Sequence, residues 1–449
     1  MTIQLSDHFN NRKLLRFTAP TILMMVFASV YGVVDGLFVS NAAGKTAFAA
    51  INLIWPSPMA LGAIGYMFGT GGCALVSKIL GEGDEKRARS YFTAITLVAF
   101  FFGTFLASAG YALVEKVAIM LGAHDPVLLD YSVRYGRIIM MALPLFILQC
   151  LFQPFLIAAE KPGWGLMVTL FAGLVNILLD YLLVYKLNQD IRLKVEGAGW
   201  ATLGSQFIGA VFPIILFALN RGQKLYFSRP AITWEALLKS CSNGLSEFVI
   251  NISAPLVNLL YVSMLLRQAG ENGVGAYGVI MYVNVVFFGV YTGYSMGCAP
   301  IVSYHYGARN VREIVNVLRR SLLMMSVFAV AVFIAAEFFA NNVASMFAGY
   351  DKEFQHIVYQ AFSIYSISFL FAPFNIYGSS FFTAMNNGKA SAVISISRVL
   401  VFQALAVLLL PRLFGTTGFW IALPVAELLT LLVTWYCFHA CRKIYFGSR

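Results

Sequence analysis

Charged side chains are scarce in this sequence. Asp, Glu, Lys and Arg make up 11% of the 449 residues, whereas 59% of the residues are hydrophobic. Soluble domains average roughly 45 to 50% apolar residues and about 25% charged ones. Charges this few cannot give a chain of this length a water-compatible surface, and we therefore expect a protein that crosses a membrane many times.

Patterns that hold metals, cofactors or nucleophiles are lacking as well. The six cysteines include no C-x-x-C pair and the five histidines are scattered, so neither a disulfide framework nor a zinc site is expected. The stretch Gly44-Lys45-Thr46 is similar to the end of a phosphate-binding loop, but Val39 stands where that motif needs its first glycine. Without an ATP site or a catalytic set, the sequence favours a secondary transporter or a channel over an enzyme, with no cofactor.

Long apolar runs are abundant instead. A helix needs about 20 residues to cross a bilayer, and these runs show no strict alternation, which favours helices over a membrane β-barrel. The fold class predicted is therefore all-α, with twelve transmembrane helices. The predicted spans cover 14–40, 46–79, 91–121, 127–159, 163–187, 199–220, 234–267, 273–305, 313–341, 353–384, 388–411 and 418–441.

The net charge of +11 could indicate a nucleic-acid partner, but the basic residues lie between the spans. Counted over alternate loops, most of the 31 Lys and Arg fall on the side of the N-terminus, among them Arg12, Lys86, Arg309 and Arg442. The positive-inside rule then places both termini in the cytoplasm. The first apolar run is too long for a removable signal peptide. We therefore expect the lipid bilayer, and no nucleic acid, as a partner.

The two halves of the chain repeat each other at a constant spacing. The recurring residues include Gly71, Ser77, Gly81 and Asp125, which return as Gly297, Ser303, Gly307 and Asp351. The longest polar, basic interruption lies at 220–235. We therefore predict an N-terminal six-helix lobe over 1–220, a cytoplasmic linker over 221–235 and a C-terminal six-helix lobe over 236–449. An even number of helices gives both lobes the same membrane orientation, so a pseudo-two-fold axis along the membrane normal should relate them.

Acidic residues inside the spans of the first half do not follow the repeat. At the constant spacing Asn176 meets Phe402 and Asp180 meets Ala406, and at a slightly shorter local spacing Asp35 meets Asn258. Asn176 and Asp180 share one helix face, at a depth similar to that of Asp35. Two carboxylates and an amide oxygen in a low dielectric can share a proton or coordinate Na⁺. The alternative is that Asp35 and Asp180 are solvated residues near a helix end.

Three ionisable residues of the second half also lie well inside predicted spans, namely Glu247, Arg398 and Glu427. An arginine inside an apolar helix must pair or extend its charge to the interface, so we expect Glu247 or Glu427 to neutralise Arg398. Glu247 could instead serve as a coupling or substrate carboxylate. In the first span, Pro20 removes a backbone hydrogen bond and can act as a hinge, or it is simply a tolerated membrane proline.

Several short motifs carry a resemblance to a known family. They are Pro20, Val-Asp-Gly-Leu-Phe-Val at 34–39, Gly81-Glu-Gly-Asp84, Ala159-Glu-Lys-Pro162 and Asn176-Ile-Leu-Leu-Asp180. In this order they resemble the multidrug and toxic compound extrusion (MATE) family, in particular its prokaryotic branch with an acidic site in the N-terminal lobe.

The resemblance implies a two-lobed antiporter of the cytoplasmic membrane, here expected to be a monomer. It would export amphipathic, often cationic, organic drugs or metabolites in exchange for H⁺ or Na⁺. It also implies that Thr202 adds an oxygen to a cation site formed by Asp35, Asn176 and Asp180. The alternative within the same broad superfamily is a flippase for lipid-linked saccharides.

The distribution of basic residues generates a prediction about topology. Cysteines introduced at Lys45, Asn188 or Asp351 should react in intact cells with a maleimide that cannot cross the membrane. Cysteines in the stretch 220–235 should react only after the cells are opened, because the positive-inside rule places this linker in the cytoplasm. Labelling of the linker in intact cells would show that the orientation is wrong.

Overall fold

The structure, a computed structural model, describes residues 3–187, 190–219, 222, 224–349 and 351–446, with side chains at all of these positions except 33, 35–43, 45 and 443–446. This part of the chain is almost entirely helical and contains no β-strand. Its helices are α1 (Asn11–Ile54), α2 (Pro56–Gly81), α3 (Glu85–Met120), α4 (Pro126–Ala158), α5 (Pro162–Asp180), η1 (Tyr181–Lys186), α6 (Ile191–Leu219), α7 (Trp234–Gly307), α8 (Val311–Ala348), α9 (Lys352–Ser366), α10 (Ser368–Ala384), α11 (Gly388–Ser395), η2 (Ile396–Gln403), α12 (Ala404–Phe414) and α13 (Thr417–Phe446).

The number of membrane spans depends on two breaks, a bend between α9 and α10 and a turn within α7. Ten of the described helices are long and apolar enough to cross a membrane, and the bent pair of α9 and α10 adds an eleventh. The 74-residue helix α7 is divided at Gly270, whose φ of 63° leaves the helical region, so it supplies two spans. Glycine adopts this left-handed backbone without steric cost. The prediction of a twelve-helix, all-α membrane fold is confirmed.

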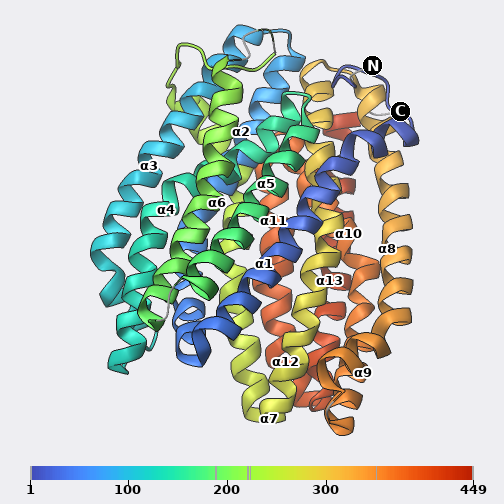
Figure 1. The fold of residues 1–449 in the computed structure, drawn as a ribbon. Helices are drawn as coiled ribbons and strands as arrows, with labels where there is room; N and C mark the ends of the chain where they lie inside the picture. Colours follow the sequence, from blue (N-terminus) through green and yellow to red (C-terminus); the bar gives the residue numbers. More distant parts are fainter. Residues whose placement is uncertain (1–2, 188–189, 220–221, 223, 350, 447–449) are drawn as a thin grey trace.

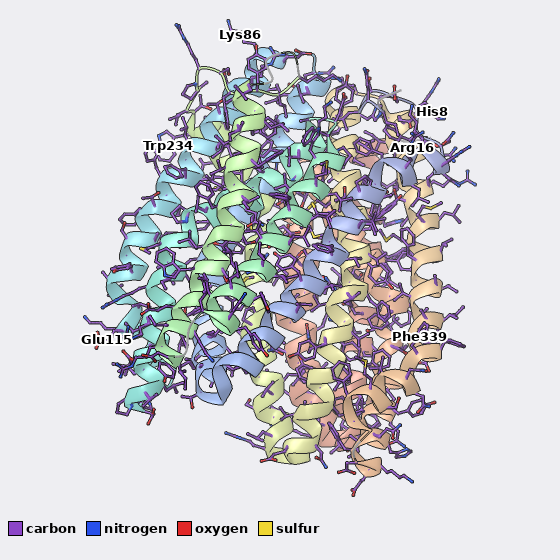
Figure 2. All side chains as sticks on the ribbon, viewed as in Figure 1. His8, Arg16, Lys86, Glu115, Trp234 and Phe339 are labelled. Carbon is purple, nitrogen blue, oxygen red and sulfur yellow. The ribbon has the colours of Figure 1, made fainter. Side chains whose placement is uncertain are left out.

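Apolar side chains cover the outside of the bundle, as a lipid environment requires. Phe101, Phe105 and Phe338 are each more than 60% exposed, and Phe339 points outward from α8 in Figure 2. His8, Arg16 and Lys86 lie in the same figure toward the end that carries both chain termini. We call this end of the molecule the terminal end.

The internal repeat is visible in the backbone. Three residues of the first half have a left-handed φ that recurs at the matching position of the second half. The pairs are Gly44 with Gly270, Gly83 with Arg309, and Glu160 with Asn386. A positive φ is uncommon for residues other than glycine, so these coincidences indicate duplicated turns between corresponding helices. The lobe boundaries at 220 and 236 stay a prediction.

The two bundles meet where α2 packs against α7. Four glycines at this contact leave no room for a side chain, because an added Cβ would lie 2.0 Å or less from a carbonyl oxygen of the opposing helix. They are Gly71 and Gly81 of α2 and Gly244 and Gly307 of α7. Close backbone approach through small residues is a common way for membrane helices to associate. Figure 1 shows α1 running obliquely across the bundle, where it contacts α7 as well as α4 and α5.

The segment that precedes α1 ties the bundles together at the terminal end. Leu5 and Phe9 are fully buried. The Leu5 N–H donates to Glu160 Oε1 at 2.8 Å, and the Phe9 N–H donates to Glu313 Oε1 at 2.9 Å. Glu160 follows α4 whereas Glu313 belongs to α8, so the segment bridges the two halves. Lys224 of the linker adds an ion pair with Glu160 at 2.7 Å.

The glycine contact generates a prediction about stability. In Gly244→Ala the new Cβ would lie 1.9 Å from the Met67 carbonyl oxygen, and a backbone atom cannot move aside locally. Overpacking of this kind costs about 1 to 3 kcal/mol, so we expect a lower melting temperature for the purified protein. Gly278→Ala is the matched control on α7, because its Cβ meets nothing within 4 Å. Equal melting temperatures for the two variants would show that the close approach is not required.

Candidate functional site

A cavity of about 710 Å³ lies between the two bundles. Its lining comes from α1, α2, α4, α5 and α6 of the first half and from α7, α10, α11 and η2 of the second. On α2 it reaches as far as Ala74, and on α7 as far as Pro300. Gly81 and Gly307 lie further along these helices toward the terminal end, where they close the interface. The volume is in the usual range for small-molecule sites, roughly 300 to 1,000 Å³.

The lining is mostly uncharged. Glu247 and Arg398 are the two charged side chains among the described residues that line the cavity. Amides and hydroxyls supply most of the remaining polar groups, and aromatic rings supply much of the apolar surface. The amides are Asn52, Gln149, Gln153, Asn176, Gln206, Asn251 and Asn375, and the rings are Tyr31, Phe48, Trp55, Tyr66, Tyr135, Phe146 and Phe288. Such a wall suits an amphipathic organic molecule with few charges.

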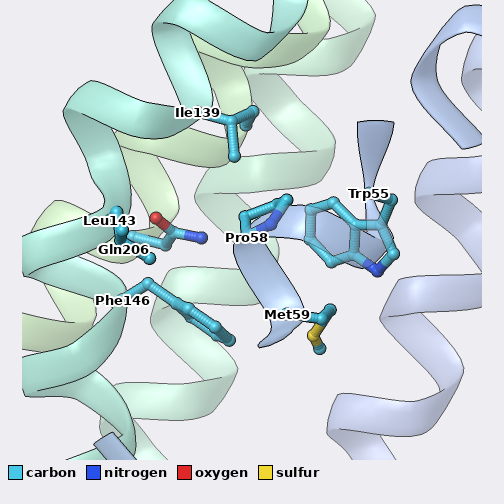
Figure 3. Close-up of a pocket in the computed structure, with 7 residues that line it drawn as sticks. All are labelled: Trp55, Pro58, Met59, Ile139, Leu143, Phe146 and Gln206. Atoms are coloured by element: carbon cyan, nitrogen blue, oxygen red, sulfur yellow. The ribbon is translucent and has the colours of Figure 1, made fainter. Parts of the chain in front are cut away.

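A narrow recess adjoins the cavity at the start of α2. Trp55, Met59, Phe146 and Gln206 line both the recess and the cavity. Figure 3 shows the indole of Trp55 and the amide of Gln206 on opposite sides of Pro58.

Three of the four residues predicted to form a cation site in the first lobe have described side chains, and the site itself stays a prediction. Asp180 ends α5 and is fully buried, which does not fit the alternative of a solvated helix-end residue. Asn176 is 3% exposed, lines the cavity, and its Oδ1 has no hydrogen-bond partner among the described residues. Thr202 also lines the cavity and donates its hydroxyl to the Ala198 carbonyl at 3.0 Å. Asp35 belongs to α1, but its side chain lies outside the described residues.

The second lobe pairs Arg398 with Glu427 and not with Glu247. Arg398 Nε donates to Glu427 Oε1 at 2.8 Å, and Glu427 is 1% exposed. Glu427 Oε2 accepts from Asn375 Nδ2 at 2.8 Å, and Asn375 Oδ1 accepts from the Thr434 hydroxyl at 2.8 Å. Glu247 forms no ion pair in the described part of the chain. Sequence reasoning missed Asn375 and Thr434, although a polar residue in the middle of an apolar span is a usable signal.

Two further residues singled out in the sequence are Asn258 and Pro20. Asn258, the counterpart of Asp35, accepts a hydrogen bond from the Tyr277 hydroxyl at 2.9 Å. Helix α1 continues past Pro20, and its one non-helical residue is Gly44. The hinge at Pro20 stays a prediction.

Comparisons with known proteins agree with this architecture. The MatE family model matches residues 20–182 and 248–408. The FAD transporter of Shewanella oneidensis is 24% identical over 435 residues, which cover 95% of this chain and 93% of the relative. The multidrug export protein MepA of Staphylococcus haemolyticus is 21% identical over 439 residues, covering 96% and 94% of the two chains.

Solved structures show the same fold. A MATE crystal structure in complex with MaL6 matches with a TM-score of 0.91 at 19% identity, covering 98% of each chain. An outward-facing MATE multidrug resistance transporter of the MOP superfamily matches with a TM-score of 0.89 at 19% identity, covering 98% of each chain. Two helical bundles around a central cavity define the class, a multi-pass membrane transporter. The MatE family model matches more than half of the chain, so the chain belongs to this family.

The Arg398 network generates a prediction about stability. Arg398→Ala leaves the Glu427 carboxylate buried without its partner, and breaking a buried pair in this way costs about 3 to 5 kcal/mol. We therefore expect a marked loss of folded protein, measured by the monodisperse fraction in size-exclusion chromatography and by thermal unfolding. Adding Glu427→Gln removes the uncompensated charge and should restore part of the loss.

Glu247→Gln is the control in this series, because Glu247 lies outside the hydrogen-bonded network. If Arg398→Ala with Glu247→Gln recovers as much stability as the combination with Glu427→Gln, the pairing seen in the structure is not the one that stabilises the protein.

Proposed function

We propose that this protein is an efflux antiporter that exchanges an inward-moving cation, H⁺ or Na⁺, for an amphipathic organic compound. The observation that carries the proposal is the cavity of about 710 Å³ between two bundles that are sealed at the terminal end. A buried carboxylate stands close behind this cavity, since Asp180 is one helical turn from the cavity-lining Asn176. The names of the relatives, a multidrug export protein and an FAD transporter, support export of small organic molecules.

The cycle follows from alternating access. In the state described here the cavity lies on the side of the Gly81 and Gly307 contacts away from the terminal end, and we assign this side to the outside. A cation enters the first-lobe site, the bundles rock about α2 and α7, and the cavity becomes accessible from the cytoplasm. One inward charge contributes about 2.3 kcal/mol per 100 mV. Coupling between two binding sites is reciprocal, so a cation that weakens drug binding is itself bound more weakly when the drug is present. Through this coupling, the energy of inward cation movement drives export of the drug.

The chemistry of the first lobe suits a small cation. Burial disfavours the charged form of a carboxylate, so a proton or a metal cation that neutralises it is bound more readily than in water. Asn176 Oδ1 and the Thr202 hydroxyl are neutral oxygens of the kind that coordinate hard cations. Both H⁺ and Na⁺ are compatible with this set, and we infer that Asp35, Asn176, Asp180 and Thr202 form it together.

The flippase alternative is less well supported by the lining. A lipid-linked saccharide carries phosphate groups, which call for several basic side chains. Among the described lining residues Arg398 is the basic one, and Glu427 already neutralises it.

We further propose that the protein works as a monomer in the cytoplasmic membrane with both termini in the cytoplasm.

The coupling site generates the central functional prediction. Asp35→Asn and Asp180→Asn keep the side-chain shape and remove the charge, so each should abolish ion-driven efflux with little change in expression or drug binding. The assay is dye export from proteoliposomes under a proton gradient or a sodium gradient, imposed separately so that the response also identifies the ion.

Asn258→Ala is the matched control, because Asn258 occupies the place of Asp35 in the second lobe and pairs with Tyr277. It should matter far less for coupling. Near wild-type pumping by both aspartate variants, or an equal loss in Asn258→Ala, would exclude the first lobe as the coupling site.

A further inference from the structure

The two charges that face the cavity both come from the second lobe. Glu247 is on α7 and Arg398 is on η2. They form no ion pair with each other among the described contacts, where Arg398 pairs with Glu427. Two opposite charges that share a cavity wall without neutralising each other directly leave room for a ligand that carries both signs.

Arg398 is held from one edge of its guanidinium. Its Nε donates to Glu427, which is itself fixed by Asn375 and Thr434. The guanidinium also lies 5.4 Å from the ring centre of Phe288, another lining residue. A guanidinium has five N–H donors, and the Nη groups make no hydrogen bond to a described residue. The network therefore fixes the position of Arg398 through Nε, while its Nη groups can donate hydrogen bonds to an acceptor on a ligand.

Glu247 completes the charge balance. Its side chain is half-buried and lines the cavity. Glu427 already compensates Arg398, so the three groups carry one net negative charge when ionised. A purely anionic ligand would be repelled by this balance, whereas a ligand with a cationic group for Glu247 and an acceptor group for Arg398 would satisfy both.

We propose that Glu247 and Arg398 form a dipolar subsite that selects zwitterionic aromatic compounds, with the ligand's carboxylate on the free edge of Arg398 and its cationic nitrogen toward Glu247. The aromatic body of the ligand packs on the ring-rich lining near Phe288. Asn375 and Glu427 act as positioning residues for Arg398. This inference rests on the proposed function, because it names the substrate class of the same cavity.

The test uses two dyes with one ring system. Rhodamine 110 is a zwitterion with a free carboxylate, and rhodamine 123 is its cationic methyl ester. Binding of each dye to the purified protein is followed by fluorescence anisotropy without any ion gradient. The wild type should bind rhodamine 110 more tightly, because only the carboxylate can form charge-assisted hydrogen bonds with Arg398.

The informative variant is Arg398→Ala combined with Glu427→Gln, which avoids an unpaired buried carboxylate. It should lose about tenfold in affinity for rhodamine 110 and less than about twofold for rhodamine 123. Glu247→Gln should weaken both dyes, since both carry the cationic ring. A wild type that prefers the ester, or a double variant that loses both dyes equally, overturns the subsite.

The outcome is separable from that of the proposed function. Equilibrium binding needs no coupling ion, so the predicted dye selectivity can be present in a protein that does not pump. Selective binding without gradient-driven efflux would contradict the antiporter proposal and support the subsite. Efflux of both dyes with no dependence on Arg398 would support the antiporter proposal and contradict the subsite.

Discussion

The backbone contact between α2 and α7 is the constraint on which the rest of the structure depends. At Gly71, Gly81, Gly244 and Gly307, a carbonyl oxygen of the opposing helix fills the space that a side chain would need. Packing this close is sensitive to a single methyl group, so the bundles are either in register or apart. An interface with two discrete states, and not a gradually deforming one, is what a two-state transporter requires.

The same interface determines where water and ligand can go. On one side of it, α1 and the inner faces of both bundles leave a cavity lined by amides, hydroxyls and rings. On the other side, the segment around Leu5 and Phe9 ties Glu160 to Glu313 and covers the join. The seal and the cavity thus come from one arrangement of helices, because the glycines that bring α2 and α7 together on one face leave the neighbouring faces free to line a space.

The sequence predicts this architecture better than it predicts the site. Apolar run lengths give twelve spans, and the constant spacing of the repeat anticipates paired turns such as Glu160 and Asn386. The partner of Arg398 could not be chosen in advance, because Glu247 and Glu427 are equally plausible by depth, and only packing brings α13 against η2. Asn375 and Thr434 stand out in the sequence as polar residues within apolar spans, but only the packing of α10 against α13 shows that they belong to the Arg398 network. The burial of Asp180 also depends on the neighbours of α5, which no periodicity reveals.

The irregular helices show how the repeat has been used differently in its two copies. The fifth span of each half starts at matching positions of the repeat, Pro162 and Gly388, and each changes from α-helix to π-helix, a feature often found at functional sites. In the first copy Asp180 stands directly before the π-segment, whereas in the second Arg398 lies within it. An acid in one lobe can change its charge by binding a cation, but an arginine stays charged throughout. Under the proposed function, coupling and substrate selection are therefore divided between the two copies, so the Arg398 guanidinium that faces the substrate keeps its charge while the other lobe takes up and releases the ion.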